Sequence, residues 1–249
     1  VLLPIVALGE LRRRGVTLPF HVEVIGFSEE EGVRFSSAYL GSKGYTGQLR
    51  ASDLKLRDAA GVTVREALTD YAIRRFSLPK PAHPESNLLG YLEVNIEQGP
   101  VLEADELAVG VVLAIAGQTR GRLAFRGQAG HAGTTPMMLR RDALAGAAEF
   151  VLAAEEVARQ NPPLVATVGT LSVTPGAANV IPGAAVLSLD LRHPRDPSRR
   201  TALRSLLARA KHIARRRRLT CAWEITQDHG AVACALPFLR IWACTISLA

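Results

Sequence analysis

The feature that most limits how this chain can fold is an alternation of strand-like and helix-like segments between residues 118 and 230. Strand-like runs lie at 122–126, 164–171 and 185–191, and runs with helical spacing lie at 142–158 and 197–214. Two helices packed on an antiparallel sheet cover one of its faces and leave the other open. The segment therefore predicts a compact α+β domain with one open sheet face.

The preceding residues have a different pattern, which predicts an α/β layer. Strand-like runs lie at 22–27 and 91–96, a helical pattern lies at 62–76, and a Pro-rich connector lies at 77–88. The first residues look like the second half of an amphipathic helix that ends at Gly15. From Ala231 onward the chain is largely apolar, and we expect a helix there that returns to the first domain.

Composition excludes several protein classes. The chain is 48% hydrophobic and 21% charged, which is ordinary for a globular protein and unlike disordered, collagen-like or disulfide-rich chains. Its 3 cysteines include no C-x-x-C pair, so we expect a reduced, cytoplasmic setting. No apolar run approaches the roughly eighteen residues that a membrane span requires, so we expect no membrane association.

Positive charge is concentrated between residues 192 and 218, where Asp196 is the single acid. Such a run can bind nucleic acid, and binding would then weaken steeply with salt. However, the run carries Leu206, Ala210 and Ile213 at helical spacing and contains no interleaved aromatic residue. We therefore interpret it as a helix with a solvated arginine face and expect no nucleic-acid partner.

Two segments of the first domain carry polar groups that suit chemistry. The acidic turn 29–31 follows a predicted buried strand, where one carboxylate could hold a cation and its neighbour could act as a general base. In the run 91–96 and just after it, Glu93, Asn95 and Glu97 alternate and would share one strand face. The structural alternative for the acidic turn is a solvated loop. For the run with Glu93, Asn95 and Glu97 it is an edge strand with one solvent-exposed side.

The second domain offers another set of candidates. His131 lies in the small-residue loop 127–136, where a ligand could approach the backbone closely and the imidazole could donate to a developing oxyanion. A turn histidine that caps the next helix is the alternative. Asn179 and Arg192 complete the set, because arginine suits bidentate binding of a carboxylate.

These motifs occur together in one order: FSEEEGVRF at 27–35, EVNIEQGPVLE at 93–103, GQAGHAGTTPM at 127–137 and NVIPG at 179–183. The chain thereby resembles the family of N-carbamoyl-L-amino-acid hydrolases, allantoate amidohydrolases and ureidopropionases, within the superfamily of dinuclear metallopeptidases and aminoacylases. The resemblance implies an α/β catalytic domain at 1–117, an inserted dimerisation (lid) domain at 118–230, and a return to the catalytic domain at 231–249. It also implies a homodimer and two zinc or manganese ions.

The resemblance further implies individual roles. Glu30 would be the general base toward metal-activated water, and Glu31 a metal ligand. His131 would reach the partner subunit's active site and stabilise the oxyanion. Gln118, Asn179 and Arg192 would bind the substrate, with Arg192 on its carboxylate. The implied reaction is hydrolysis of a linear C–N bond in a carbamoyl or ureido substrate.

The chain also departs from the family pattern. Asn95 stands where the family has a metal-binding histidine, and a neutral amide is a poor zinc or manganese ligand. Of the five ligand positions that the resemblance implies, Glu31 alone is retained, and the family's other ligand segments would lie before Val1 and after Ala249. We therefore expect a fragment with little or no activity. The alternative is a non-catalytic protein that dimerises or holds a carboxylate ligand.

Overall fold

The computed structural model describes residues 2–71 and 78–235. Their contacts divide the chain into two units, 1–99 and 100–249, which are described separately below. Strand β2 begins at Gly117, one residue before the boundary predicted at residue 118. No helix among the described residues is long and apolar enough to cross a membrane.

The second unit contains the predicted α+β domain. Its strands are β1 (Ala114–Ile115), β2 (Gly117–Arg126), β3 (Gly130–His131), β4 (Val165–Thr167), β5 (Leu171–Thr174), β6 (Val180–Ile181), β7 (Ala184–His193), β8 (Thr220–His229) and β9 (Val232–Ala233). Its helices are α4 (Val101–Ala104), the short 3-10 helix η3 (Met137–Leu139), α5 (Ala143–Gln160) and α6 (Asp196–Arg216).

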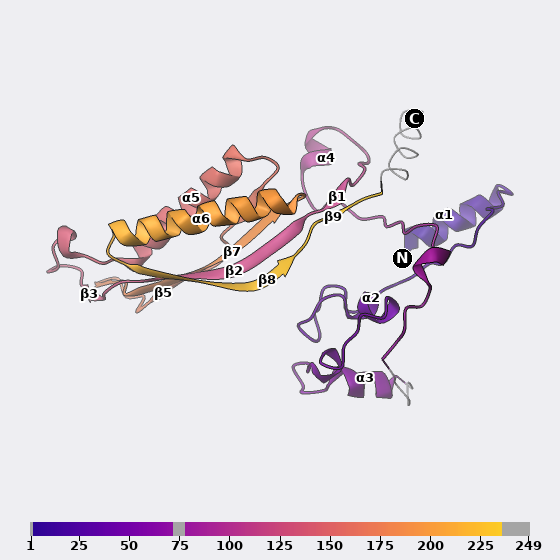
Figure 1. Cartoon of the computed structure of the whole chain (residues 1–249), viewed down its shortest axis with the longest axis horizontal. Coiled ribbons are helices and arrows are strands. Elements are labelled where there is room, and N and C mark those ends of the chain that lie inside the picture. The colour runs from indigo at the N-terminus through magenta and orange to yellow at the C-terminus, as the bar shows by residue number, and fades with distance from the viewer. Residues whose placement is uncertain (1, 72–77, 236–249) are drawn as a thin grey trace. The chain divides into compact units, whose positions relative to one another are not determined.

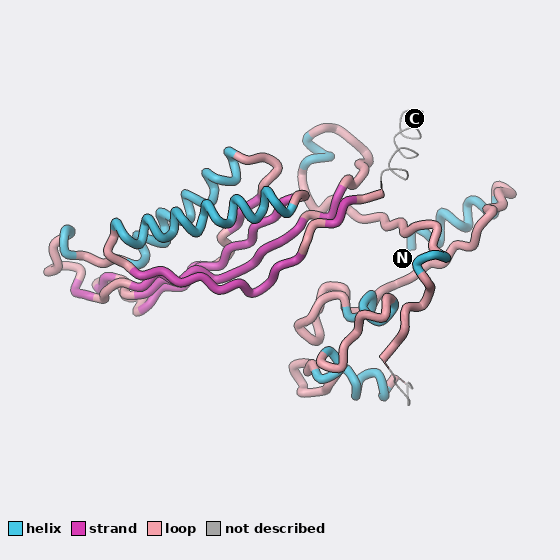
Figure 2. Tube along the Cα trace, viewed as in Figure 1, coloured by secondary structure: helices cyan, strands magenta, loops and turns pink. Residues whose placement is uncertain are grey.

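A five-stranded antiparallel sheet organises this unit, in the order β4-β7-β2-β8 with β5 also paired to β7. Helices α5 and α6 lie on one face of the sheet, as Figures 1 and 2 show. Alternate residues of β2 and β7 face these helices and form the core with Phe150 and Leu206, all of which are buried. The predicted open sheet face is confirmed, since the other set of alternate residues is exposed or half-buried.

Both long helices begin and end close to the predicted residues because local sequence signals specify them. Asp142 is the N-cap of α5, and its Oδ1 accepts a hydrogen bond from the backbone N–H of Ala145 at 3.0 Å. Pro197 lies in the first turn of α6, where its missing N–H costs nothing. The arginine face of α6 is tied to α5 by ion pairs of Arg209 with Glu156 and of Arg217 with Glu149.

The first unit contains short helices and loops: α1 (Leu2–Arg13), α2 (Leu40–Tyr45), η1 (Asp53–Lys55), α3 (Val64–Asp70) and η2 (Glu85–Asn87). The prediction that the first helix ends at Gly15 is confirmed. Gly15 has a φ of 69°, and the N–H groups of Gly15 and Val16 return to the carbonyls of Arg12 and Leu11. A small apolar core forms around Phe35, Leu40, Leu49, Leu54 and Val64.

Several predictions need correction. The runs 22–27 and 91–96 are not strands, because neither pairs with another segment among the described residues and a strand requires a hydrogen-bonded neighbour. Ile96 is 79% exposed, and the described residues of this unit form no sheet, so the predicted α/β layer is not found among them. The predicted strand 164–171 is divided between β4 and β5. The predicted helix at 62–76 is α3 up to Asp70, and residues 72–77 lie outside the described residues. The helix predicted from Ala231 onward is wrong at its start, because Val232 and Ala233 form β9, which pairs with β1, and the tail from 236 lies outside the described residues.

Candidate functional site

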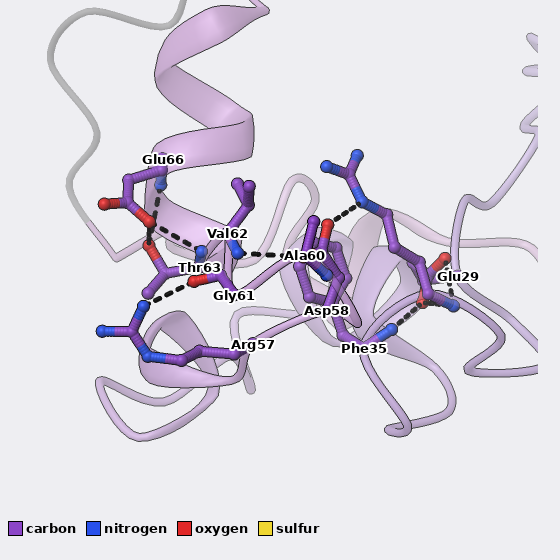
Figure 3. Close-up of polar contacts among 10 residues, drawn as sticks. Glu29, Phe35, Arg57, Asp58, Ala60, Gly61, Val62, Thr63 and Glu66 are labelled. Atoms are coloured by element: carbon purple, nitrogen blue, oxygen red, sulfur yellow. Dashed lines mark hydrogen bonds and ion pairs between the residues drawn. The ribbon is translucent and has the colours of Figure 1, made fainter.

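The acidic turn is held by Glu29, which leaves its two neighbours exposed. The Glu29 carboxylate accepts hydrogen bonds from the backbone N–H groups of Arg34 and Phe35, each at 3.2 Å to Oε2, and Figure 3 shows Glu29 beside Phe35. The carbonyl of Glu30 accepts from the N–H of Tyr39 at 3.1 Å, just before α2. Glu29 thus closes the loop, and the carboxylates of Glu30 and Glu31 extend into solvent.

The loop that follows is fastened by a second polar network to residues 58–62, just before α3. The Nε of Arg34 donates to Asp58 Oδ2 at 3.0 Å, and Asp58 Oδ1 accepts from the N–H groups of Ala60 and Val62. Thr63 and Glu66 form a capping box at the beginning of α3. This network gives the Glu30–Glu31 turn a defined support.

Asn95 lies in an exposed segment without strand pairing among the described residues. Among the described residues no three His, Cys, Asp or Glu side chains come together in a way that could hold a metal ion. Glu31 with the amide of Asn95 is a poor donor set for zinc or manganese, which favour imidazole, thiolate and carboxylate ligands. The described donors therefore do not fit the two-metal centre that the resemblance implies.

Gln118 and Arg192 lie side by side on the open face of the sheet in the second unit. They are direct partners in the antiparallel pairing of β2 with β7. Both side chains contact Asp190: Gln118 Nε2 donates to Oδ2 at 3.0 Å, and Arg192 donates through Nε and Nη2, each at 3.0 Å. Two of the predicted substrate-binding residues are thus joined by a carboxylate.

A hollow of about 770 Å³ lies on this open face, and Asp190 and Arg192 contribute to its wall. Its other polar lining residues are Arg120, Arg122, Thr167, Ser188, His193 and Thr226. Sequence reasoning missed Asp190, although the alternation of β7 places it on the same face as Arg192 and was available as a signal. A hollow rich in guanidinium groups suits an anionic ligand.

His131 and Asn179 form the second cluster. Strands β3 and β6 pair through His131 and Val180, and the carbonyl of Asn179 accepts from the N–H of Ala132 at 3.0 Å. The N–H of Gly133 donates to His131 Nδ1 at 3.1 Å, which leaves Nε2 as the ring nitrogen that can donate a hydrogen bond. The exposed His131 therefore presents a hydrogen-bond donor to solvent.

The two clusters lie at opposite ends of the sheet. Gln118 is near the beginning of β2, whereas β3 lies beyond the end of β2 at Arg126, as Figure 1 shows, and β6 pairs with β3. At about 3.3 Å per residue, the strand from Gln118 to Arg126 spans about 26 Å. One copy of the domain cannot bring His131 and Arg192 to the same small ligand.

Comparisons with known proteins agree with this fold. Residues 113–218 match the model of the peptidase dimerisation domain. The chain is 40% identical over 247 residues to an allantoate deiminase from Arabidopsis thaliana, covering 90% of this chain and 46% of the relative. It is 38% identical over 225 residues to an N-carbamoyl-L-amino acid amidohydrolase from Geobacillus stearothermophilus, covering 90% of this chain and 55% of the relative.

Among solved structures, an amidase of the hydantoinase/carbamoylase family from Burkholderia multivorans superimposes with a TM-score of 0.85 at 33% identity, over 92% of this chain and 56% of that one. The chain spans about half the length of the curated relatives it matches. The resemblance drawn from the sequence motifs is thereby confirmed. With its open-faced sheet and two covering helices matched as a dimerisation domain, this chain belongs to the hydantoinase/carbamoylase family of amidohydrolases.

Proposed function

We propose that this protein is a subunit of a homodimeric hydrolase of linear C–N bonds, acting on N-carbamoyl-L-amino acids or allantoate. In this proposal residues 1–117 belong to the catalytic domain, 118–230 form the dimerisation domain and 231–249 lead back to the catalytic domain. The relatives named as allantoate deiminase and N-carbamoyl-L-amino acid amidohydrolase support the substrate class.

The observation that carries the proposal is the pairing of Gln118 with Arg192, which itself lines a hollow rich in arginine. A guanidinium there can bind the carboxylate that these substrates share, and the amide can bind a neighbouring polar group. Asn179 and His131 are too far away in the same domain to join them. Their position supports a dimer in which one subunit supplies His131 and Asn179 to a ligand on its partner.

The chemistry follows from the hydrogen bond that His131 accepts and from the exposure of Glu30. Because Nδ1 of His131 is an acceptor, its Nε2–H can donate to the oxyanion that develops on the attacked carbonyl. Glu30 is exposed on a supported turn and can take a proton from the attacking water. The described donors do not fit two metal ions, and we propose that Asn95 impairs hydrolysis.

A non-catalytic protein that dimerises and binds a carboxylate ligand is the second candidate. It is favoured by Asn95, because an amide in place of an imidazole removes metal affinity without affecting the hollow at Arg192.

Metal content and turnover separate the two candidates. The purified protein and the Asn95→His variant would be incubated with zinc or manganese, and their bound metal would be measured by inductively coupled plasma emission spectroscopy. Both would then be assayed for hydrolysis of N-carbamoyl-L-alanine and of allantoate. Turnover by the unchanged chain with bound metal supports the enzyme and refutes the claim that Asn95 is disabling. Binding of N-carbamoyl-L-alanine without turnover, abolished by Arg192→Ala, supports the non-catalytic candidate. Light scattering that gives a monomer would refute the dimer in both.

A further inference from the structure

Asp190 is the most heavily bonded side chain on the open face of the sheet. Its Oδ2 accepts from Gln118 Nε2 at 3.0 Å, from Arg120 Nε at 2.7 Å and from Arg192 Nη2 at 3.0 Å. Its Oδ1 accepts from Arg192 Nε at 3.0 Å. The carboxylate lies between β7 and β2, and its side chain is 23% exposed. Asp190 therefore links Gln118, Arg120 and Arg192 on the open face of the sheet.

The ionised state of Asp190 dictates how those neighbours are oriented. Partial burial raises the pKa of Asp190, but hydrogen bonds from Arg192 and Arg120 outweigh it and hold the pKa below the usual aspartate value. An ionised carboxylate can only accept hydrogen bonds. Gln118 must therefore turn its amide nitrogen toward Asp190, which directs its carbonyl oxygen away from the carboxylate. The two bonds from Arg192 fix the plane of its guanidinium group.

The charge balance of the hollow still favours an anion. Among the described residues Asp190 is the one carboxylate in its wall, against the guanidinium groups of Arg120, Arg122 and Arg192. Arg120 and Arg192 both form ion pairs with Asp190, so one negative charge is set against two positive charges. Asp190 thus orients Arg192 without cancelling the positive charge of the hollow.

We propose that Asp190 is a positioning residue that presets Gln118 and Arg192 for a ligand carrying a carboxylate next to an N–H group. The guanidinium of Arg192 receives the carboxylate, and the carbonyl oxygen of Gln118 receives the N–H. The inference rests on the proposed function, since it concerns the same ligand class, but it assigns a role to a side chain that does not itself touch the ligand.

The test compares Asp190→Asn with Glu224→Gln in the full chain. Both substitutions neutralise one carboxylate on the open face. Glu224, however, lies on β8 opposite Arg122, and among the described residues it forms no hydrogen bond with Gln118 or Arg192. Binding of N-carbamoyl-L-alanine would be measured by titration calorimetry. We expect Asp190→Asn to weaken binding about tenfold or more, because charge-assisted hydrogen bonds are lost, and Glu224→Gln to leave it unchanged.

A second measurement reports orientation without any ligand. Nitrogen-15 spectra would follow the side-chain Nε–H of Arg192 and the amide group of Gln118, which we expect to be shifted and protected from exchange in the unchanged protein. Asp190→Asn should remove both signatures, because the ionised acceptor that both groups share is lost. Glu224→Gln should keep them.

The outcomes separate this inference from the proposed function. If Arg192→Ala loses binding while Asp190→Asn binds within about twofold of the unchanged chain, the positioning role is overturned and the carboxylate site stands. If the unchanged chain does not bind N-carbamoyl-L-alanine, or if Arg192→Ala binds it as tightly as the unchanged chain, the carboxylate site is refuted. The inference about Asp190 is then refuted with it. Loss of binding and of both spectral signatures in Asp190→Asn alone supports the inference.

Discussion

Replacing Arg199 with methionine should destabilise the second unit, because this guanidinium is fully buried and joins three elements. Arg199 lies on α6, has 0% side-chain exposure, and forms ion pairs with Asp196 at 3.0 Å and with Asp228 of β8. It also donates to the hydroxyl of Thr119 on β2. Methionine keeps much of the volume and removes the charge.

The magnitude depends on what happens to the carboxylates left behind. Breaking a buried ion pair costs about 3–5 kcal/mol when the remaining charge stays buried. Here the side chains of Asp196 and Asp228 are 26% and 47% exposed, so water can solvate both. We therefore expect the free energy of unfolding to fall by about 2–3 kcal/mol at neutral pH, below the full penalty.

The same contacts predict a pH dependence. The hydrogen bond from Arg199 lowers the pKa of Asp228 and of Asp196 below the usual aspartate value. A carboxyl with a lowered folded-state pKa stabilises the fold above its unfolded-state pKa, near 3.9, and loses this contribution as the pH falls through the folded-state value. The difference between the unchanged protein and Arg199→Met should therefore narrow below about pH 4.

Urea unfolding followed by circular dichroism would measure the effect, since α5 and α6 supply most of the helical signal. Urea is preferred because it is uncharged and does not screen ion pairs. Arg204→Met is the matched control: Arg204 is exposed on the same helix, and we expect a change within about 0.5 kcal/mol. A loss below about 1 kcal/mol in Arg199→Met, or an equal loss at neutral and acid pH, would refute the reasoning.

Three further changes test the packing and the loop. Phe150→Ala should cost about 3–5 kcal/mol in urea unfolding, because Phe150 is fully buried with its ring 6.3 Å from that of Phe125; a loss near zero would contradict the core. Asp142→Ala should cost about 1 kcal/mol by removing the N-cap of α5, and Asp142→Asn should restore most of it. Glu29→Ala should make the loop at 29–35 faster to cleave in limited proteolysis, whereas Glu31→Ala should not.

The open-faced α+β domain could be predicted because its signals are local or periodic. The N-cap Asp142, the apolar spacing of α6 and the alternation of β7 each specify an element within a few residues. The motif around His131 and the acidic turn at 29–31 identified the family, and the comparisons confirm that membership. The roles of Glu30, Glu31, His131, Gln118, Asn179 and Arg192 remain predictions.

What the tertiary structure decided is which distant residues meet. Gln118 and Arg192 become neighbours through the register of β2 with β7, and Asp190 becomes their shared acceptor. The pattern of charges along α6 showed an arginine face but not that Arg199 would be buried against β2 and β8. The runs 22–27 and 91–96 have strand-like patterns yet form no strands among the described residues. The physical reason is the same in each case: a helix closes its hydrogen bonds within one turn of the chain, whereas a strand, a buried ion pair and a binding site need partners that only the folded arrangement supplies.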